Sequence, residues 1–400
     1  MTSLMMSSCQ ENKEMYSISF FEYMYTYIGI NVYIHESEYD EIKKDIQNIY
    51  ETYHNLTTSY DPLPENSEFL NNVYSINQNK GQKLEIDKAL YDVFQQAKTY
   101  ETLTNHYFDM TLGTPVKLWK SLIEKTPEEL QIGTRLYIHS YSNLVVERSG
   151  VVLELEDHQI TVDFGDTTES YSRDDLLYEI EVSTEDYNNT KALVDALDKN
   201  LATLILEEVE DTYFVTFQAT AETIDLGAFT KGYATNLVKE YLIDRGVEYF
   251  SISAGTSSIS VGRNINRPEQ DEVFIVSLTD PVFTGSFFSQ YYGTINIKDT
   301  SIATSGNFEQ YTLYEGTRYH HIISPITYYP VNEYYALTIV GEDAGLLDAL
   351  STALYVMDFE TLETFMNEHQ ETLNIQVIAY LQDGTIYTFG DTLNFEEKTS

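Results

Sequence analysis

The sequence predicts an α+β fold in which antiparallel sheets pack with helices, and into which a small SH3-like β-barrel is inserted. Three observations lead to this prediction. Residues 16–34 are rich in aromatic and β-branched side chains, and residues 375–389 contain an Asp-Gly turn between two apolar runs, which is typical of a hairpin. Residues 39–53 and 86–104 have apolar side chains at helical spacing. Residues 133–186 contain short alternating runs separated by turns.

The buried faces of the two predicted helices can be named from their spacing. In 39–53 the apolar stripe consists of Ile42, Ile46 and Ile49. In 86–104 it consists of Leu90, Val93, Phe94 and Ala97. We expect Asp87 to cap the second helix through its side chain.

The stretch 133–186 divides the chain into domains. We expect a flexible N-terminus at 1–15, a main domain formed by 16–132 and 187–400, and a separate β domain between them, because surface loops tolerate such insertions. His139 and His158 lie in this insert beside acidic residues. Their spacing to other ligand types matches no metal site, and we expect both to be solvated.

The composition excludes several classes of function. The chain has 400 residues with a formal net charge of −41. Binding to nucleic acid needs a basic face, and electrostatic docking to anionic lipid needs basic clusters, so neither is expected. Cys9 is the single cysteine, which rules out an internal disulfide and a cysteine metal cluster.

Residues 222–242, ETIDLGAFTKGYATNLVKEYL, combine a glycine-containing turn with the start of a helix. Such a junction offers free backbone N–H groups and the positive end of the helix dipole, where a phosphate can bind. Lys231 adds a full positive charge at the same place. On its own the pattern equally fits a structural turn that binds nothing.

A second helix, 345–357, contains an acid within an apolar sequence, GLLDALSTALYVM. Asp348 and Thr352 are four residues apart and share one helix face, together with Ser351. A buried carboxylate without a partner is costly, and a hard cation such as Mg²⁺ coordinated by oxygen atoms removes that cost. The alternative is a capping or hydrogen-bonding role.

Taken together, these segments resemble the ApbE family of FAD-dependent flavin transferases. The run D-L-G-A-F-T-K-G-Y-A is similar to the family's D-L-G-G-I-A-K-G-Y-A. Further similar blocks occur in the family's order: residues 105–119 with an F-D-x-T-x-G core and the chain's one tryptophan, 301–306 (SIATSG), 318–331 (RYHHIISPITYYPV) and 345–357. The resemblance covers most of the chain outside the insert and implies an ApbE-like, T-fold-like architecture.

The resemblance implies a reaction and a set of site residues. In the family, the hydroxyl of a threonine on an acceptor protein attacks the FMN-side phosphorus of FAD, with Mg²⁺ on the pyrophosphate, and AMP leaves. His321 is implied as the catalytic base. The implied FAD-binding residues are Asn77, Phe108, Asp109, Thr111, Asp225, Lys231, Gly255, Thr304, Ser305, Gly306 and His321, and the implied metal ligands are Thr230 (through its carbonyl), Asp348, Ser351 and Thr352. Asn77 also fits a cap or turn role.

The chain departs from the family pattern at several positions. Thr256 and Ser324 stand where the family has acids or an amide, Met110 replaces a proline, and Gly29-Ile30 stands where the family usually has Gly-Thr. Three functions therefore remain open: the transferase, a hydrolase that splits FAD into FMN and AMP, and a non-catalytic FAD-binding surface lipoprotein. The chain itself contains no convincing Asp-x-x-[Ser/Thr]-x-Ala-Thr acceptor motif, so the acceptor is expected to be another protein.

The first residues, MTSLMMSSCQENK, resemble the end of a bacterial lipoprotein signal, in which a cysteine is lipidated. The charged start and the long apolar stretch of such a signal are missing. Because many family members are surface lipoproteins, we expect a lipid on Cys9 and a location on the extracytoplasmic face of the membrane. The alternative is a cytoplasmic protein in which Cys9 is an ordinary residue.

Overall fold

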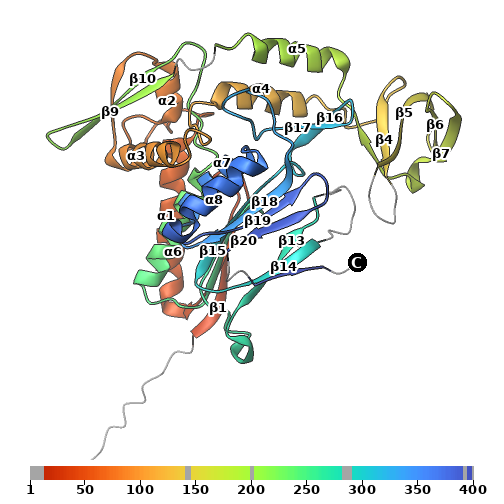
Figure 1. The fold of residues 1–400 in the computed structure, drawn as a ribbon. Coiled ribbons are helices and arrows are strands. Elements are labelled where there is room, and N and C mark those ends of the chain that lie inside the picture. Colours follow the sequence, from red (N-terminus) through yellow and green to blue (C-terminus); the bar gives the residue numbers. More distant parts are fainter. Residues whose placement is uncertain (1–12, 140–145, 199–201, 282–290, 391–393, 399–400) are drawn as a thin grey trace, which may run out of the picture.

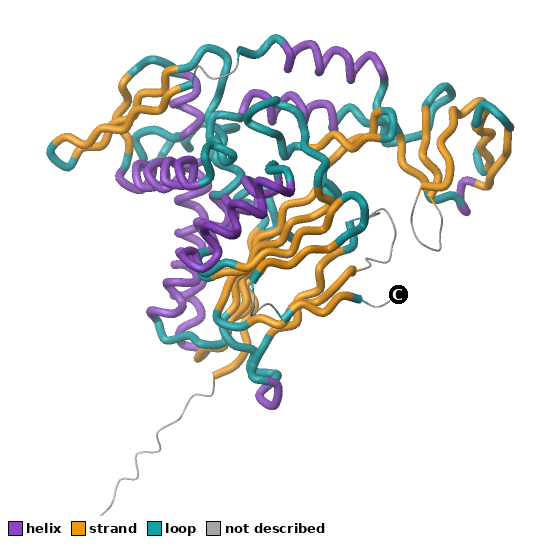
Figure 2. Tube along the Cα trace, in the orientation of Figure 1, coloured by secondary structure: helices purple, strands orange, loops and turns teal. Residues whose placement is uncertain are grey.

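The computed structural model describes residues 13–139, 146–198, 202–281, 291–390 and 394–398, and it confirms the α+β class (Figures 1 and 2). Its centre is an antiparallel sheet in the order β1-β2-β11-β12-β15-β18-β19-β20. The strands are β1 (Lys13–Phe20), β2 (Ile28–His35), β11 (Phe250–Ala254), β12 (Ser258–Val261), β15 (Thr300–Gly306), β18 (Tyr334–Gly341), β19 (Gln376–Leu381) and β20 (Ile386–Phe389).

Both faces of this sheet are covered, because successive residues of its inner strands are apolar and point to opposite faces. Helices α1 (Tyr39–Thr57), α6 (Thr230–Asp244), α7 (Ala344–Tyr355) and α8 (Phe359–Leu373) cover one face, where Ile339 and Val377 point. The neighbouring residues Val340 and Ile378 point to the other face. There they pack against a small sheet of β13 (Phe274–Thr279), β14 (Tyr291–Ile297) and β21 (Phe395–Glu397).

Helices α6 and α7 touch through a glycine. A Cβ atom at Gly232 would lie 2.2 Å from the carbonyl oxygen of Ala344 and 2.6 Å from Cβ of Asp348. Only glycine permits this close approach. The contact brings the backbone of α6 against the acidic side chain of α7, which positions the site described below.

A second layer contains the predicted helix 86–104. This helix is α3 (Lys88–Leu103), and all four residues of its predicted stripe are buried. It packs with α2 (Val73–Gln78) and the sheet β3-β10-β9, formed by β3 (Lys83–Ile86), β10 (Thr212–Gln218) and β9 (Thr203–Val209). Asp87 occupies the N-cap position, but its side chain accepts a hydrogen bond from the Leu70 N–H (2.9 Å) and not from the helix, so the predicted capping bond is wrong.

The insert is a five-stranded antiparallel sheet in the order β7-β6-β5-β4-β8, and it protrudes from the main body (Figure 1). Its strands are β4 (Arg135–His139), β5 (Val146–Leu155), β6 (Gln159–Asp163), β7 (Thr168–Ser172) and β8 (Tyr178–Ile180). Strands β7 and β8 lie at opposite ends of this order. No pairing joins them within the described residues, so closure into a barrel stays a prediction.

The insert has its own core, in which Leu136, Val152, Ile160 and Val162 are fully buried. His158 is exposed as predicted. His139, by contrast, is 4% exposed and its Nε2 lies 2.6 Å from Glu179 Oε2, so its predicted solvation is wrong. All residues of β4 after Arg135 are buried, and His139, the last of them, meets the carboxylate of Glu179 on β8.

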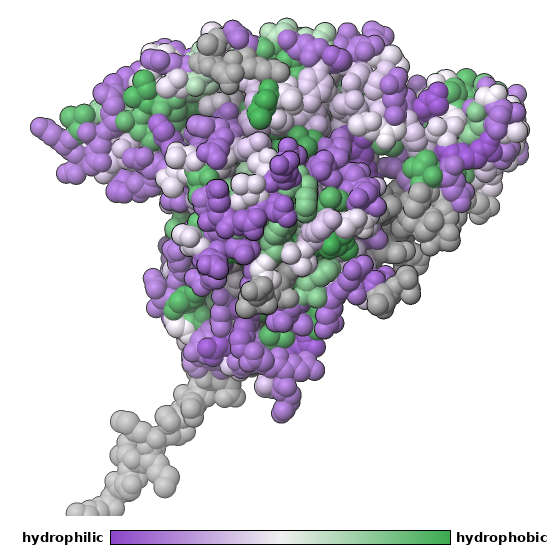
Figure 3. All heavy atoms as spheres, in the orientation of Figure 1, coloured by the Kyte–Doolittle hydropathy of each residue, from purple (hydrophilic) through white to green (hydrophobic). Residues whose placement is uncertain are grey.

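The remaining elements connect these parts. They are α4 (Gly113–Ile123), α5 (Thr184–Asp195), the hairpin β16 (Tyr311–Tyr314) and β17 (Thr317–His320), and the short 3₁₀ helices η1 (Glu36–Glu38), η2 (Arg173–Asp175) and η3 (Pro268–Gln270). Hydrophilic residues dominate the face in Figure 3, in keeping with the net charge of −41. Of the helices described, none is long and apolar enough to cross a membrane. Cys9 lies outside the described residues.

We predict that residues 133–180 can be replaced by a short Gly/Ser linker without loss of the main fold. The Glu181 N–H donates to the Arg135 carbonyl (3.0 Å), so the two ends of the insert are adjacent and a short linker spans them. The insert also has its own core, which the main domain does not need. Thermal unfolding of the variant should stay cooperative and FAD should still bind. Loss of the thermal transition would show that the insert belongs to the main core.

Candidate active site

The predicted site residues converge on one cavity of about 850 Å³ between the end of the central sheet, α6 and α7. This volume is within the range of small-molecule sites. All predicted residues except Asn77 and Thr111 line it: Phe108, Asp109, Asp225, Thr230, Lys231, Gly255, Thr304, Ser305, Gly306, His321, Asp348, Ser351 and Thr352. Segments more than 200 residues apart in the sequence therefore form one site.

The two exceptions have other places. Asn77 is buried behind the wall of the cavity, where its side chain donates to the Ile224 carbonyl (2.9 Å) and accepts from the Ile224 N–H (2.8 Å). It thereby holds the segment that leads into Asp225. Thr111 lines an adjacent cleft and bonds to Asp109. Their proposed contacts with FAD remain predictions.

Asp348 is the buried acid of the site. It is 4% exposed, and its Oδ2 accepts a hydrogen bond from the Gly232 N–H (2.9 Å). Burial raises the pKa of this carboxyl, while Lys231 and the Gly232 N–H act in the opposite direction. A buried carboxylate is stabilised by a cation. Asp348 at the cavity wall, with hydroxyl groups beside it, is thus a candidate ligand of a hard metal ion.

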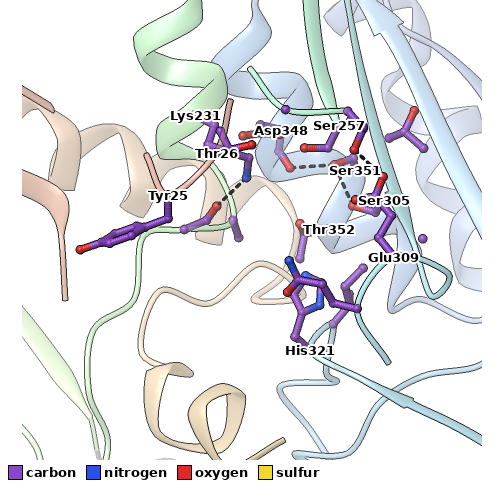
Figure 4. A pocket seen from close by; sticks show the side chains of 18 of the residues that line it. Tyr25, Thr26, Lys231, Ser257, Ser305, Glu309, His321, Asp348, Ser351 and Thr352 are labelled. Atoms are coloured by element: carbon purple, nitrogen blue, oxygen red, sulfur yellow. Dashed lines mark hydrogen bonds between the residues drawn. The ribbon is translucent and has the colours of Figure 1, made fainter. Parts of the chain in front are cut away.

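The hydroxyl groups near Asp348 form a short chain across α7 and β15 (Figure 4). Ser305 donates to Ser351 (2.9 Å), and Ser351 donates to the backbone carbonyl of Asp348 (2.9 Å). Ser351 thus uses its proton within α7, while Thr352 lines the cavity and lies between Asp348 and His321 in Figure 4. Among the described residues, no group of three or more His, Cys, Asp or Glu side chains could hold a metal ion.

Backbone N–H groups at the start of α6, which the sequence predicts to be free, are already hydrogen-bonded. The Thr230 N–H donates to the Leu226 carbonyl (3.0 Å), and the Gly232 N–H is taken by Asp348. These two N–H groups are not free for a phosphate. The positive charge at this end of the cavity comes from Lys231, whose Nζ reaches the Gly227 carbonyl (3.1 Å).

His321 faces the cavity from the loop that follows β17 (Figure 4). Burial lowers the pKa of its imidazole to about 3, helped by the positive charges of Lys120 and Lys231. The Gln310 backbone is a hydrogen-bond partner of the ring, whereas Nδ1 is buried and has no partner within the described part of the chain. The imidazole is therefore neutral at pH 7, and the lone pair of Nδ1 is available to accept a proton.

The preceding His320 gives a testable pH dependence of stability. It is fully buried; its Nδ1 accepts from the Ile322 N–H (3.2 Å) and its Nε2 pairs with the Val331 carbonyl (3.1 Å), which fixes the neutral form. Burial lowers its pKa from 6.5 to about 4. Its contribution to stability is thus complete above pH 6.5 and is lost as the pH falls from 6.5 towards 4.

We expect the wild type to lose about 2 kcal/mol more unfolding free energy between pH 7.5 and pH 5 than a His320→Gln variant, since each pKa unit corresponds to about 1.4 kcal/mol. Urea unfolding at both pH values measures the difference. Parallel losses in the two proteins would contradict the assignment of this titration to His320.

The sequence did not point to another part of the cavity wall, formed by Met24, Tyr25 and Thr26. Met24 and Tyr25 have φ angles of 55° and 53°, a conformation that glycine adopts more easily. Gly255, at φ 69°, lies so close that a Cβ atom there would be 2.7 Å from Thr26 Oγ1. Gly29-Ile30, which we compared with the family's Gly-Thr, is within β2 and does not line the cavity.

The two missing acids have different explanations. Thr256 lines the cavity and donates its hydroxyl to the carboxylate of Glu309, so an acid is present beside it. Ser324 is buried outside the cavity wall, and its Oγ accepts from the N–H groups of Ile326 (3.1 Å) and Thr327 (3.4 Å). A serine and an aspartate can both make these turn bonds. The change at 324 therefore removes no side chain from the cavity.

The fold and the cavity define an ApbE-type protein, and comparisons with known proteins agree. The ApbE family model matches residues 24–196 and 178–377, so the chain belongs to the ApbE family. It is 29% identical over 161 residues to an FAD:protein FMN transferase of Klebsiella pneumoniae (strain 342), covering 39% of this chain and 45% of that protein. It is 31% identical over 137 residues to that of Rhodobacter capsulatus, covering 34% and 24%. The matched part is thus less than half of either relative.

Solved structures agree in fold. An ApbE protein from Thermotoga maritima has a TM-score of 0.63 at 20% identity, with 94% of this chain and 96% of that chain covered. The flavin transferase ApbE from Vibrio cholerae has a TM-score of 0.60 at 19% identity, with 95% and 98% covered. The ApbE-like architecture predicted from the motifs is therefore confirmed.

Proposed function

We propose that this protein transfers FMN from FAD to a threonine hydroxyl of an acceptor protein and releases AMP. One observation carries the proposal: a neutral histidine, whose Nδ1 has no hydrogen-bond partner among the described residues, faces the same cavity as a buried carboxylate and a lysine. Family membership and the names of the matched relatives support it. Transfer of a phosphoryl-type group needs positioning and charge neutralisation more than covalent help from the enzyme.

The residues can be assigned to steps of this reaction. Lys231 and Lys120 would attract the pyrophosphate, because the positive charges that lower the pKa of His321 favour an anion in the cavity. His321 Nδ1 would take the proton of the incoming threonine hydroxyl. The threonine oxygen then bonds to the FMN-side phosphorus, the bond from that phosphorus to the oxygen of AMP breaks, and AMP leaves with that oxygen.

We also propose that Mg²⁺ takes part. The donor set fits a hard cation, because Asp348 is buried, has a raised pKa and lies beside the Thr352 hydroxyl in the cavity wall. Asp348, Thr352 and the carbonyl of Thr230 would hold the ion, with phosphate oxygens of FAD completing its shell. When bound, the ion would neutralise charge on the pyrophosphate. Ser351 would be a further ligand through its hydroxyl oxygen, whose proton is donated to the Asp348 carbonyl.

Water could take the place of the threonine, and the protein would then be a FAD hydrolase that yields FMN and AMP. The site does not distinguish these nucleophiles, because both would use the same base and cation. If the protein binds FAD and catalyses neither transfer nor hydrolysis, it is a non-catalytic flavin-binding protein. The acceptor hydroxyl is favoured because the matched relatives are protein FMN transferases.

The test is a transfer assay. The purified protein is given FAD, Mg²⁺ and a domain that carries the Asp-x-x-[Ser/Thr]-x-Ala-Thr motif. We expect the mass of the domain to rise by one FMN and AMP to be released in equal amount. A domain with Thr→Val at the last motif position is the control and should stay unmodified. Release of AMP and free FMN at the same rate without acceptor would favour the hydrolase, and FAD binding without AMP release would favour the binding protein.

A further inference from the structure

The inserted sheet is joined directly to the hairpin that leads to His321. The Val182 N–H, just after β8, donates to the Leu313 carbonyl of β16 (3.0 Å). The Glu315 N–H in the turn of the hairpin donates to Glu181 Oε2 (2.9 Å). The end of the insert is thus hydrogen-bonded to one edge of the hairpin β16-β17, which precedes His321.

A buried polar cluster lies at this junction. His139 Nε2 and Glu179 Oε2 are 2.6 Å apart, with side chains 3% and 15% exposed. The Tyr311 hydroxyl of β16 donates to Glu179 Oε1. Burial alone would favour the protonated acid, but the bonds from His139 and Tyr311 hold the pKa of Glu179 below its usual range. Glu179 is therefore a carboxylate at neutral pH and a strong acceptor for the tyrosine.

Tyr311 in turn is adjacent to the base of the site. In the hairpin, Tyr311 pairs with His320, the residue before His321. Gln310, the residue before Tyr311, supplies the backbone group that bonds to the His321 ring. Arg318 reinforces the same hairpin, since its guanidinium lies 4.4 Å from the Tyr311 ring centroid and bonds to Asn307 Oδ1 (3.2 Å) behind Gly306. A shift of Tyr311 would therefore move the Gln310 backbone and the imidazole together.

We propose that Glu179 and His139 of the inserted sheet position His321 for catalysis, by fixing Tyr311 and with it the Gln310 backbone that orients the imidazole. The proposal rests on the proposed function for the role of His321. Glu179, His139 and Tyr311 are positioning residues, since none of them lines the cavity. The insert is thereby a structural part of the active site as well as a separate β domain.

The test compares two tyrosines of this protein that each donate to a glutamate of the insert. Tyr311→Phe removes the bond to Glu179. Tyr171→Phe is the matched control, because the half-buried Tyr171 donates to Glu169 (2.9 Å) within the outer strand β7, away from the hairpin. We expect kcat for FMN transfer to fall about tenfold to a hundredfold in Tyr311→Phe, with an unchanged KM for FAD, because small misplacements of catalytic groups have effects of this size. Tyr171→Phe should match the wild type.

A second readout does not need turnover. In ¹⁵N-labelled protein, the imidazole nitrogens of His321 should indicate one neutral tautomer in the wild type and in Tyr171→Phe, with Nδ1 unprotonated. We expect a mixture of tautomers in Tyr311→Phe. Glu179→Ala, which removes the acceptor of the Tyr311 hydroxyl, should have the same effect, and it provides a second variant if Tyr311→Phe does not fold.

The outcomes separate this proposal from the proposed function. Unchanged kcat and an unchanged His321 spectrum in Tyr311→Phe and Glu179→Ala would overturn it, even if the thermal midpoint falls. If the wild type transfers no FMN at all, the proposed function fails. The tautomer comparison still decides whether the insert positions the imidazole.

Discussion

Asp348→Ala should lower Mg²⁺-dependent AMP release by about a hundredfold or more, a loss typical of residues that hold or orient a metal. The reason is that this buried carboxylate lies in the cavity wall, where the Gly232 N–H is its one hydrogen-bond donor among the residues that the structure describes. Removal of the acid would leave the proposed cation without its charged protein ligand. The fold should persist, because the raised pKa indicates that a charged Asp348 does not favour folding in the absence of a cation.

Asp348→Asn is the matched control for shape. Its amide oxygen can still accept the Gly232 N–H, so the contact of α6 with α7 is kept while the charge is removed. We expect both variants to lose the rise in thermal midpoint that Mg²⁺ gives the wild type in the presence of FAD, a readout that does not depend on turnover. The assignment would be refuted if Asp348→Ala were fully active in metal-buffered solution while a chelator abolished the activity of the wild type.

The sequence predicted most of the site because its motifs are short and local. Each block places its functional residues at a fixed spacing on one element, as Asp348, Ser351 and Thr352 are on α7. Their order along the chain then identified the family, and with it the way in which the blocks meet. No spacing within a single block could have predicted the contact between α6 and α7, because it depends on Gly232 and on the close approach of the two helices.

What the sequence did not predict depends on tertiary contacts. The positive φ angles of Met24 and Tyr25 leave no recognisable pattern in the sequence, because neither residue type is characteristic of this backbone conformation. The buried His139 looked like a solvated residue because its partner, Glu179, is 40 positions away in the sequence.

His321→Ala should lower the rate of FMN transfer by about a hundredfold to ten-thousandfold, the usual cost of removing a general base. FAD binding should persist, because the ligand would be held by Lys231, by the small-residue turns and by the proposed cation. His158→Ala is the control, since that histidine is exposed in the insert. Binding is measured by fluorescence titration and transfer by the mass of the acceptor domain.

The pH dependence makes this prediction more specific. The pKa of His321 is lowered to about 3 in the free protein, so the imidazole stays unprotonated from pH 8 down to pH 5. The kcat/KM of the wild type reflects the free enzyme. It should therefore not decline near pH 6.5, and in this pH range its profile should have the same shape as that of His321→Ala. Bound pyrophosphate should raise the pKa of His321, because anions favour the imidazolium. An acidic decline should consequently be visible in kcat before it is visible in kcat/KM. Equal transfer rates in His321→Ala and the wild type would show that another group, or the solvent, accepts the proton.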